Sequence, residues 1–135
     1  MSIPVPLRQL DDALHERGSA AYVLTVSELG TPHVVHAVVT SEGDRLRATV
    51  GAHTADNAAR RPRVSLLYPT RTTTDYSLIV DAVATVEVTE DGPCLLLKPT
   101  RAVLHRPAPA PDPATSPCGS DCVPLALGGL ARGAS

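Results

Sequence analysis

The chain has 135 residues, the length of one ordinary domain, so a two-domain enzyme is excluded. Hydrophobic residues make up 43% of it but aromatic residues only 2%, with neither Phe nor Trp, so we expect a core of Val, Leu, Ala and Ile. A formal net charge of -2 argues against a dedicated nucleic-acid binder, whose surface would be strongly basic.

The chain also lacks the marks of a secreted or membrane-spanning protein. Residues 1–8 show no basic segment followed by an apolar one, and no apolar run approaches the roughly 20 residues that cross a bilayer. Three unevenly spaced cysteines, Cys94, Cys118 and Cys122, do not make a disulfide framework. We therefore expect a cytoplasmic protein without a membrane or nucleic-acid partner.

The first half of the chain predicts one helix and three antiparallel strands. Apolar residues recur at helical spacing over 7–17, and Gly18 follows as a cap. Strand-like runs cover 20–27 and 33–40, with turn residues between them. A hairpin signal then leads into 45–50, where polar and apolar residues alternate.

A second short helix follows the third strand. Thr54 is a good N-cap for residues 55–61, and Pro62 must end the helix. Residues 64–68 then predict a fourth strand.

The remaining strands are expected to contain one bend and one interruption. Residues 76–90 are too long for an average strand, so we predict one bent strand or two short ones around Ala82. Residues 94–98 and 101–105 are predicted as the last strands, separated by Pro99, which suits an edge or a bulge.

The composition changes after this last strand. Prolines alternate with other residues from position 107, a pattern typical of extended and largely unpaired chain. We therefore divide the chain into a domain at 1–106 and a Pro-rich, Cys-containing tail at 107–135.

These elements describe a mainly β protein, a six- to seven-stranded antiparallel split β-barrel with one N-terminal helix and one short helix after the third strand. The residues resemble the actinobacterial flavin- and deazaflavin-dependent branch of the pyridoxamine 5'-phosphate oxidase-like split barrels. The resemblance covers residues 7–107, with the Cys118 to Cys122 segment in addition. It is carried by YVLTVS at 22–27, GTPH at 30–33, HTADN at 53–57, RPRVSL at 61–66, YSLIVD at 76–81 and PTRAVLHRP at 99–107.

The resemblance implies a homodimer with FMN or a deazaflavin in each of two clefts at the subunit interface. The cofactor phosphate would lie near the end of the third strand and the start of the next helix, where helix amides and Arg favour anions. The phosphate candidates are Arg47, Thr49, Thr54 and Asn57. The cofactor ring would lie against Val35, His36 and Ala37.

Three positions depart from the family pattern, one of them Ala82, where relatives often have Gly at the strand bend. Ala52 stands where members usually have a basic residue, and Asp56 stands where another is common, so FMN affinity is expected to be reduced. We predict an oxidoreductase that transfers a hydride to or from a small conjugated substrate, with no catalytic residue assigned. The alternative is a non-catalytic ligand- or metal-binding module that has lost FMN phosphate ligands.

The histidines have a structural explanation as well as a functional one. His33 and His36 are three apart on one strand and face opposite sides, so they make a poor metal pair, although His36 suits a flavin ring or ordinary packing. His53 and His105 have no partner at a diagnostic spacing.

The clustered arginines and the tail cysteines also have both a structural and a functional explanation. The arginines at 60, 61 and 63 suit either a phosphate or the negative end of a helix dipole. Cys118 and Cys122 fit a disulfide, half of a metal site, or inert thiols. Neither a nucleophile elbow nor a Gly-rich phosphate loop is present.

Overall fold

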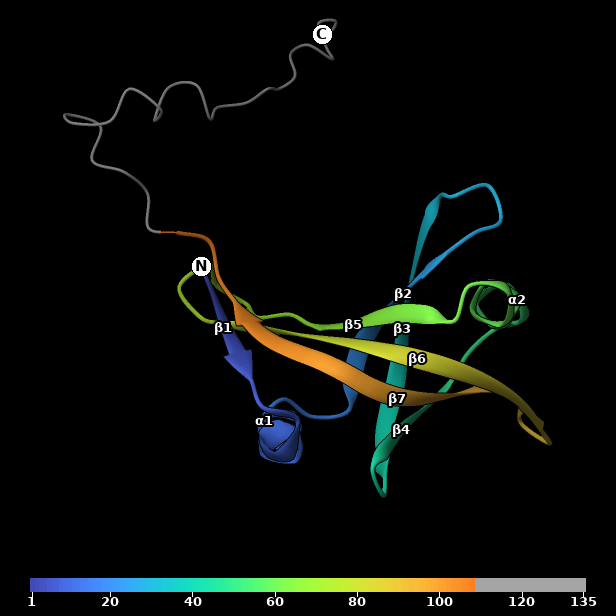
Figure 1. Cartoon of the computed structure of the whole chain (residues 1–135), viewed down its shortest axis with the longest axis horizontal. Coiled ribbons are helices and arrows are strands. Elements are labelled where there is room, and N and C mark those ends of the chain that lie inside the picture. The colour runs from blue at the N-terminus through green and yellow to red at the C-terminus, as the bar shows by residue number, and fades with distance from the viewer. Residues whose placement is uncertain (109–135) are drawn as a thin grey trace, which may run out of the picture.

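A computed structural model describes residues 1–108 of the chain. Its elements, in chain order, are β1 (Ser2–Val5), the 3-10 turn η1 (Leu7–Gln9), α1 (Leu10–His15), β2 (Ala20–Val26), β3 (Pro32–Glu42), β4 (Arg45–Thr49), α2 (Ala52–Arg60), β5 (Arg63–Tyr68), β6 (Ser77–Thr89) and β7 (Gly92–His105). Figure 1 shows α1 and α2 on different sides of the strands.

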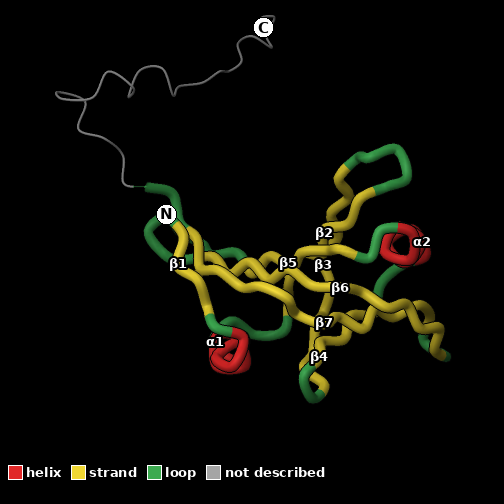
Figure 2. The backbone as a smooth tube through the Cα atoms, in the orientation of Figure 1, coloured by secondary structure: helices red, strands yellow, loops and turns green. Residues whose placement is uncertain are grey.

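The strands form a closed barrel of antiparallel pairs. Its order is β7-β4-β3-β2-β5-β6, and β6 pairs back with β7 to close it. β1 is the extra strand, added to β7 outside the closed ring, as the tube in Figure 2 shows. The predicted mainly β split barrel with two helices is therefore confirmed. None of the helices in the described residues combines the length and apolarity that a bilayer span requires.

Two strand predictions need correction. β1 was not expected, because Ser2–Val5 contains Pro4. The strand is mostly exposed and pairs with the distant end of β7. The last two predicted strands are one strand, β7, which continues through Pro99. The bent strand expected around Ala82 is confirmed as β6.

The bend in β6 coincides with a bulge in β7. The register passes from Asp81 opposite Arg101 to Ala82 opposite Pro99, so Thr100 is an extra residue on β7. Pro99 has no N–H to donate. The hydroxyl of Thr100 instead donates to the carbonyl oxygen of Asp81 at 3.2 Å. The bulge therefore lets β7 include a proline without leaving the Asp81 carbonyl unpaired.

The barrel interior is filled with aliphatic side chains. The fully buried ones include Val23, Leu66, Leu78, Val80, Leu95 and Leu97. Leu, Val and Ala are present as expected, but Ile3 is exposed and Ile79 only half-buried, so isoleucine contributes nothing to the buried core. Tyr68 is the buried aromatic, and burial raises its pKa to about 12.

α2 begins three residues earlier than predicted. Gly51, in extended backbone conformation, is the N-cap, and Thr54 lies inside the helix with its side chain buried. Ala55 and Ala58 share the buried face, where small side chains let the helix approach the barrel closely. The Thr54 prediction was wrong because the hydroxyl is used for packing rather than for capping.

Asn57 joins α2 to the barrel through one buried hydrogen bond. Its side-chain amide donates to the hydroxyl of Thr25 on β2 at 3.1 Å, and both side chains are buried. A buried polar group that loses its partner costs much more than the bond itself contributes. The pair therefore fixes where α2 sits.

Removing one partner of this bond is expected to destabilise the fold. Asn57→Ala leaves the Thr25 hydroxyl unpaired and should lower the free energy of unfolding by about 2 kcal/mol. Thr25→Val combined with Asn57→Leu removes both polar groups and should recover most of that loss. Urea unfolding measures both, with the exposed neighbour substitution Asp56→Ala as control. Equal losses in the single and double variants would contradict the pairing.

Candidate functional site

The seven residues predicted to bind a cofactor lie in two groups. Those on β3 alternate: Val35 and Ala37 pack against the core, whereas His36 points outward and is exposed. The other four lie on β4 and α2, and they also divide. Thr54 and Asn57 are buried beneath α2, while Arg47 and Thr49 alternate with the buried residues of β4 and therefore point outward.

The start of α2 is open to an anion. Ala55 donates the first intrahelical bond, to the Gly51 carbonyl at 3.0 Å, so the amides of Ala52, His53 and Thr54 come before it. Gly51 makes no side-chain cap, and the first turn contains no acidic residue. Asp56, expected in that turn, lies in the second turn because the helix begins at Ala52. These amides and the positive end of the helix dipole are suited to phosphate.

Two histidines stand together at this end of α2. The rings of His33 on β3 and His53 on α2 are stacked, with centroids 5.7 Å apart and planes at 28°. The Nδ1 atom of His33 is buried and has no hydrogen-bond partner in the described part of the chain. Sequence spacing could not indicate this pair, because 20 positions separate its members and only the fold brings them together.

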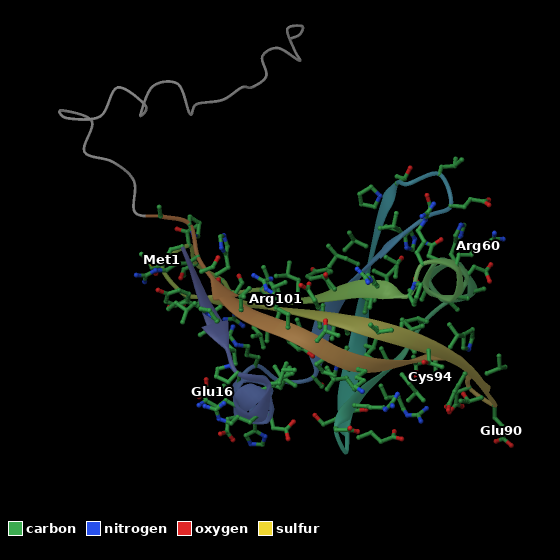
Figure 3. All side chains as sticks on the ribbon, viewed as in Figure 1. Met1, Glu16, Arg60, Glu90, Cys94 and Arg101 are labelled. Carbon is green, nitrogen blue, oxygen red and sulfur yellow. The ribbon has the colours of Figure 1, made fainter. Side chains whose placement is uncertain are left out.

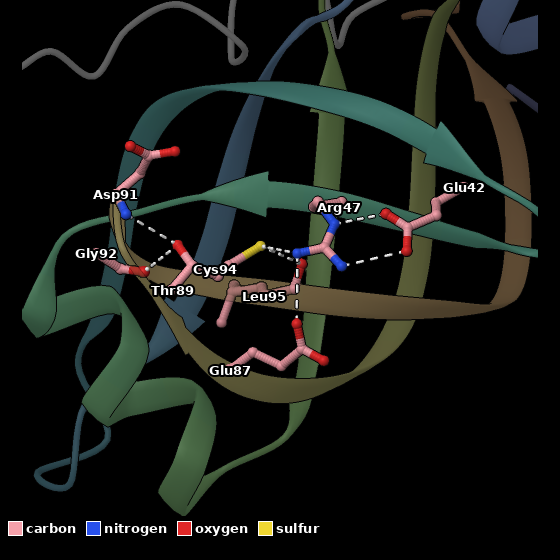
Figure 4. A network of polar contacts seen from close by, with 8 residues as sticks. All are labelled: Glu42, Arg47, Glu87, Thr89, Asp91, Gly92, Cys94 and Leu95. Atoms are coloured by element: carbon pink, nitrogen blue, oxygen red, sulfur yellow. Dashed lines mark hydrogen bonds and ion pairs between the residues drawn. The ribbon is translucent and has the colours of Figure 1, made fainter.

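Arg47 is already engaged by acidic side chains. Its Nε donates to Glu42 Oε2 at 2.5 Å, Nη2 to Glu42 Oε1 at 3.2 Å, and Nη1 to Glu87 Oε1 at 3.4 Å (Figure 4). Nη1 also contacts the Sγ of buried Cys94 at 3.2 Å. The guanidinium predicted to hold phosphate is therefore bound to two carboxylates and a thiol.

The ion pair between Arg47 and Glu42 stays charged at neutral pH. The hydrogen bond from Arg47 lowers the pKa of Glu42, and hydrogen bonds to Glu42 and then Cys94 raise the pKa of Arg47. Because the pKa of Glu42 is lowered, its carboxylate is ionised at and above the ordinary pKa of a glutamate. The ion pair is lost only when the pH falls through the lowered value. An anion must compete with Glu42 for Arg47 under ordinary conditions.

The outer face of β3 is apolar around one imidazole. Val34 and Val38 flank His36 on the same face and are 53% and 61% exposed. The His36 ring stacks on Tyr22 of β2, with centroids 4.9 Å apart and planes at 27°. His33 and His36 therefore face opposite sides, as their spacing predicted.

Two of the three clustered arginines hold a loop. Arg61 donates to the carbonyls of Ser27 and Glu28, each at 3.1 Å, and Arg60 pairs with the Glu28 carboxylate at 3.5 Å. Figure 3 shows Arg60 on the far side of α2 from the barrel. The structural explanation holds for both, because they fasten the β2–β3 turn to the end of α2.

The remaining candidates are His105, which has a structural role, and the two cysteines of the tail. The Nδ1 of His105 hydrogen-bonds the hydroxyl of Ser2 at 3.0 Å and so joins β1 to β7. Within residues 1–108, no three His, Cys, Asp or Glu side chains gather to hold a metal ion. Cys118 and Cys122 lie outside the described residues, so the predicted metal or disulfide there stays a prediction.

Comparison with known proteins first gives sequence relatives. No family model matches the chain. It is 36% identical over 140 residues to the uncharacterized protein Mb0449c of Mycobacterium bovis, a match that covers 88% of this chain and 93% of the relative. The uncharacterized protein MT0457 of Mycobacterium tuberculosis matches with the same identity and coverage.

Solved structures with the same fold are more distant in sequence. A Clostridium acetobutylicum protein of the pyridoxinephosphate oxidase family, related to general stress protein 26, is 11% identical with a TM-score of 0.60, covering 76% of this chain and 91% of its own. The FAD binding protein from Mycobacterium smegmatis is 14% identical with a TM-score of 0.56, covering 78% and 100%.

An F420 reductase is 19% identical with a TM-score of 0.55, covering 67% of this chain and 94% of its own. At these identities the likeness concerns the fold, while the mycobacterial relatives establish kinship in sequence. The chain therefore belongs to the same family as Mb0449c and MT0457, and its fold is that of the pyridoxamine 5'-phosphate oxidase-like split barrels.

Proposed function

We propose that this chain is a flavin- or deazaflavin-binding oxidoreductase that acts on a small conjugated substrate. Proteins with this fold include an FAD binding protein and an F420 reductase. The observation that carries the proposal is the start of α2. No side chain caps it, so its amides are available to a phosphate, and its first turn contains no acidic residue.

The residues around this helix start fit the phosphate end of such a cofactor. Gly51, Ala52 and His53 are exposed, so an anion reaches the amides, and exposed Thr49 supplies a hydroxyl at the end of β4. His53 and His33 add a pair of stacked imidazole rings beside these amides. Thr54 and Asn57 support the site from beneath the helix, and Arg47 joins it when Glu42 releases the guanidinium.

The outer face of β3 is the proposed place for the ring. His36 and the backbone beside Val35 and Ala37 would meet its polar edge, and Val34 and Val38 would exclude water. A bound flavin supplies the hydride chemistry itself, so the chain's own task is to position and shield it.

A specific observation also favours the alternative, a non-catalytic binding module. Arg47 is paired with Glu42 and Glu87, and Ala52 offers no side-chain charge, so no arginine or lysine at the helix start is free for phosphate in the described residues. On that alternative the helix start takes a smaller anion or a ligand without phosphate.

We further propose a homodimer that covers the outer face of β3. Tyr22, Val34 and Val38 expose apolar surface on neighbouring strands, which is typical of an interaction site rather than of a solvated sheet face. A second copy placed there would also enclose a ring lying along β3.

The first prediction concerns cofactor capture. The full chain titrated with FMN and with F420 should quench the fluorescence of one of them and retain about one equivalent per subunit after desalting. Ala52→Arg should tighten FMN binding about tenfold, because it adds a charge-assisted hydrogen bond at the helix start. Ala59→Arg, exposed in the last turn of α2, is the matched control and should change nothing. If neither the parent chain nor Ala52→Arg retains FMN or F420, the oxidoreductase proposal is wrong and the non-catalytic binding module remains.

A second prediction tests the competition for Arg47. Glu42→Gln together with Glu87→Gln removes both carboxylates that hold the guanidinium, and FMN affinity should rise about tenfold. Adding Arg47→Ala should abolish the gain. Glu90→Gln together with Asp91→Asn removes two exposed carboxylates in the β6–β7 turn and so controls for the same change in net charge. A gain that survives the loss of Arg47 would remove Arg47 from the site.

The third prediction concerns assembly. Val38→Lys places a charge in the middle of the proposed interface and should convert a dimer to a monomer in sedimentation velocity. Val88→Lys changes an equally apolar residue that is 84% exposed on β6, and it should leave the dimer intact. A dimer in both variants would place the interface elsewhere.

A further inference from the structure

A groove of about 580 Å³ lies over the outer side of the barrel, and none of the seven predicted cofactor residues lines it. Its volume is in the range of small-molecule sites. It spans β2, the start of β3 and β5 to β7, and it includes the bulge. Its lining includes Leu24, Val26, Arg63, Ser65, Asp81 and Val83.

A carboxylate is fixed in this groove. Ser65 lies directly opposite Asp81 in the β5–β6 register, and its hydroxyl donates to Asp81 Oδ1 at 2.7 Å. Among residues 1–108, Oδ2 is contacted by Arg101 on β7 alone, at 3.5 Å, and the Asp81 side chain is 40% exposed. An exposed pair at that distance contributes little, so Oδ2 is able to accept a hydrogen bond from a ligand.

A guanidinium stands diagonally across from that carboxylate. Arg63 is two residues from Ser65 on the same face of β5, opposite Val83 on β6. It is exposed and takes part in no side-chain hydrogen bond or ion pair within residues 1–108. Diagonal neighbours in antiparallel sheets lie about 7–8 Å apart, which leaves space for a ligand between Arg63 and Asp81.

The groove floor between the two charges is apolar. Leu24 and Val26 project from β2, and Val83 from β6 is 40% exposed. A flat hydrocarbon or heteroaromatic body gains by covering such a surface.

We propose that this groove binds a small, flat ligand that carries an anionic group at one end and a hydrogen-bond donor, such as an amine, at the other. Arg63 takes the anion, for which its planar fork is suited, and Asp81 Oδ2 accepts from the donor. Ser65 positions Asp81. The groove adjoins the proposed ring face, because Leu24 lies opposite Val34 in the β2–β3 register, but its lining includes none of the residues proposed for the flavin. Binding of this ligand therefore does not require a bound flavin.

Three related probes test this pairing of charges. The full chain, labelled with 15N, is titrated by NMR with 4-(aminomethyl)benzoate, which carries both groups, and with benzoate and benzylamine, which carry one each. The first should bind at least about tenfold more tightly than either of the others, with amide shifts concentrated on Val26, Arg63 and Val83.

Two substitutions assign the two ends. Arg63→Gln should reduce binding of 4-(aminomethyl)benzoate to the level of benzylamine, and Asp81→Asn should reduce it to the level of benzoate. Arg71→Gln, an exposed arginine in the loop after β5 that does not line the groove, is the matched control and should leave the affinity unchanged. A dispersed amide spectrum shows whether each variant is folded. If Asp81→Asn is unfolded, the Arg63→Gln variant, which changes an exposed residue, still tests the proposal.

The proposal is overturned if the three probes bind equally, if their shifts lie outside the groove, or if folded Arg63→Gln keeps the affinity of the parent protein. The experiment contains no flavin. A protein that fails to bind FMN or F420 can therefore still bind the probe, and the two failures are distinguishable.

Discussion

Pairing between β6 and β7 is the interaction on which the rest of the molecule depends. Every residue of β6 from Ser77 to Thr89 has a partner on β7, and β7 also pairs with β4 and β1. Without this hairpin the other strands would form an open sheet with two unpaired edges. A pairing of that length must bend to close a six-stranded ring, and the bulge at Thr100 supplies the bend. The same bulge brings Thr100 and Asp81 to the groove wall.

Closure with so few strands decides where ligands bind. An eight-stranded barrel has an interior just wide enough for side chains to fill, so a six-stranded one has no room for a cofactor inside. Here that interior holds Leu66, Leu78, Leu95 and Leu97, all fully buried. Any ligand site must therefore lie on the outside, and the three proposed here are the start of α2, the face of β3 and the groove. An outer site is shallow, which is the physical reason for proposing that a second copy covers part of it.

Local patterns predicted the elements, and non-local contacts decided the details. Alternation along 45–50 and 64–68 was sufficient to predict β4 and β5, because one face of each strand is buried. β1 escaped prediction because it depends on pairing with β7, about 100 positions away in the sequence. α2 starts early because the barrel accepts Thr54 as a buried side chain, which sequence cannot distinguish from a cap.

The candidate site was harder to predict than the fold for the same reason. Residue type indicated that Arg47 would suit a phosphate, but Glu42 and Glu87 reach it only through the β3–β4 hairpin and the β6–β7 pairing. His53 had no visible partner in sequence, yet His33 stacks on it. A role read from residue type describes what a side chain is able to bind, whereas the fold decides what it already binds.

The distribution of arginine partners distinguishes the two anion sites proposed for this protein. Arg47 and Arg61 are engaged by carboxylates and carbonyls, whereas Arg63 has no such partner in the described residues. At the start of α2 the charge comes from backbone amides, and beyond its other end it comes from Arg63. A helix of nine residues is about 14 Å long, too long for one phosphate to reach both. The two proposed sites would therefore bind different anionic groups.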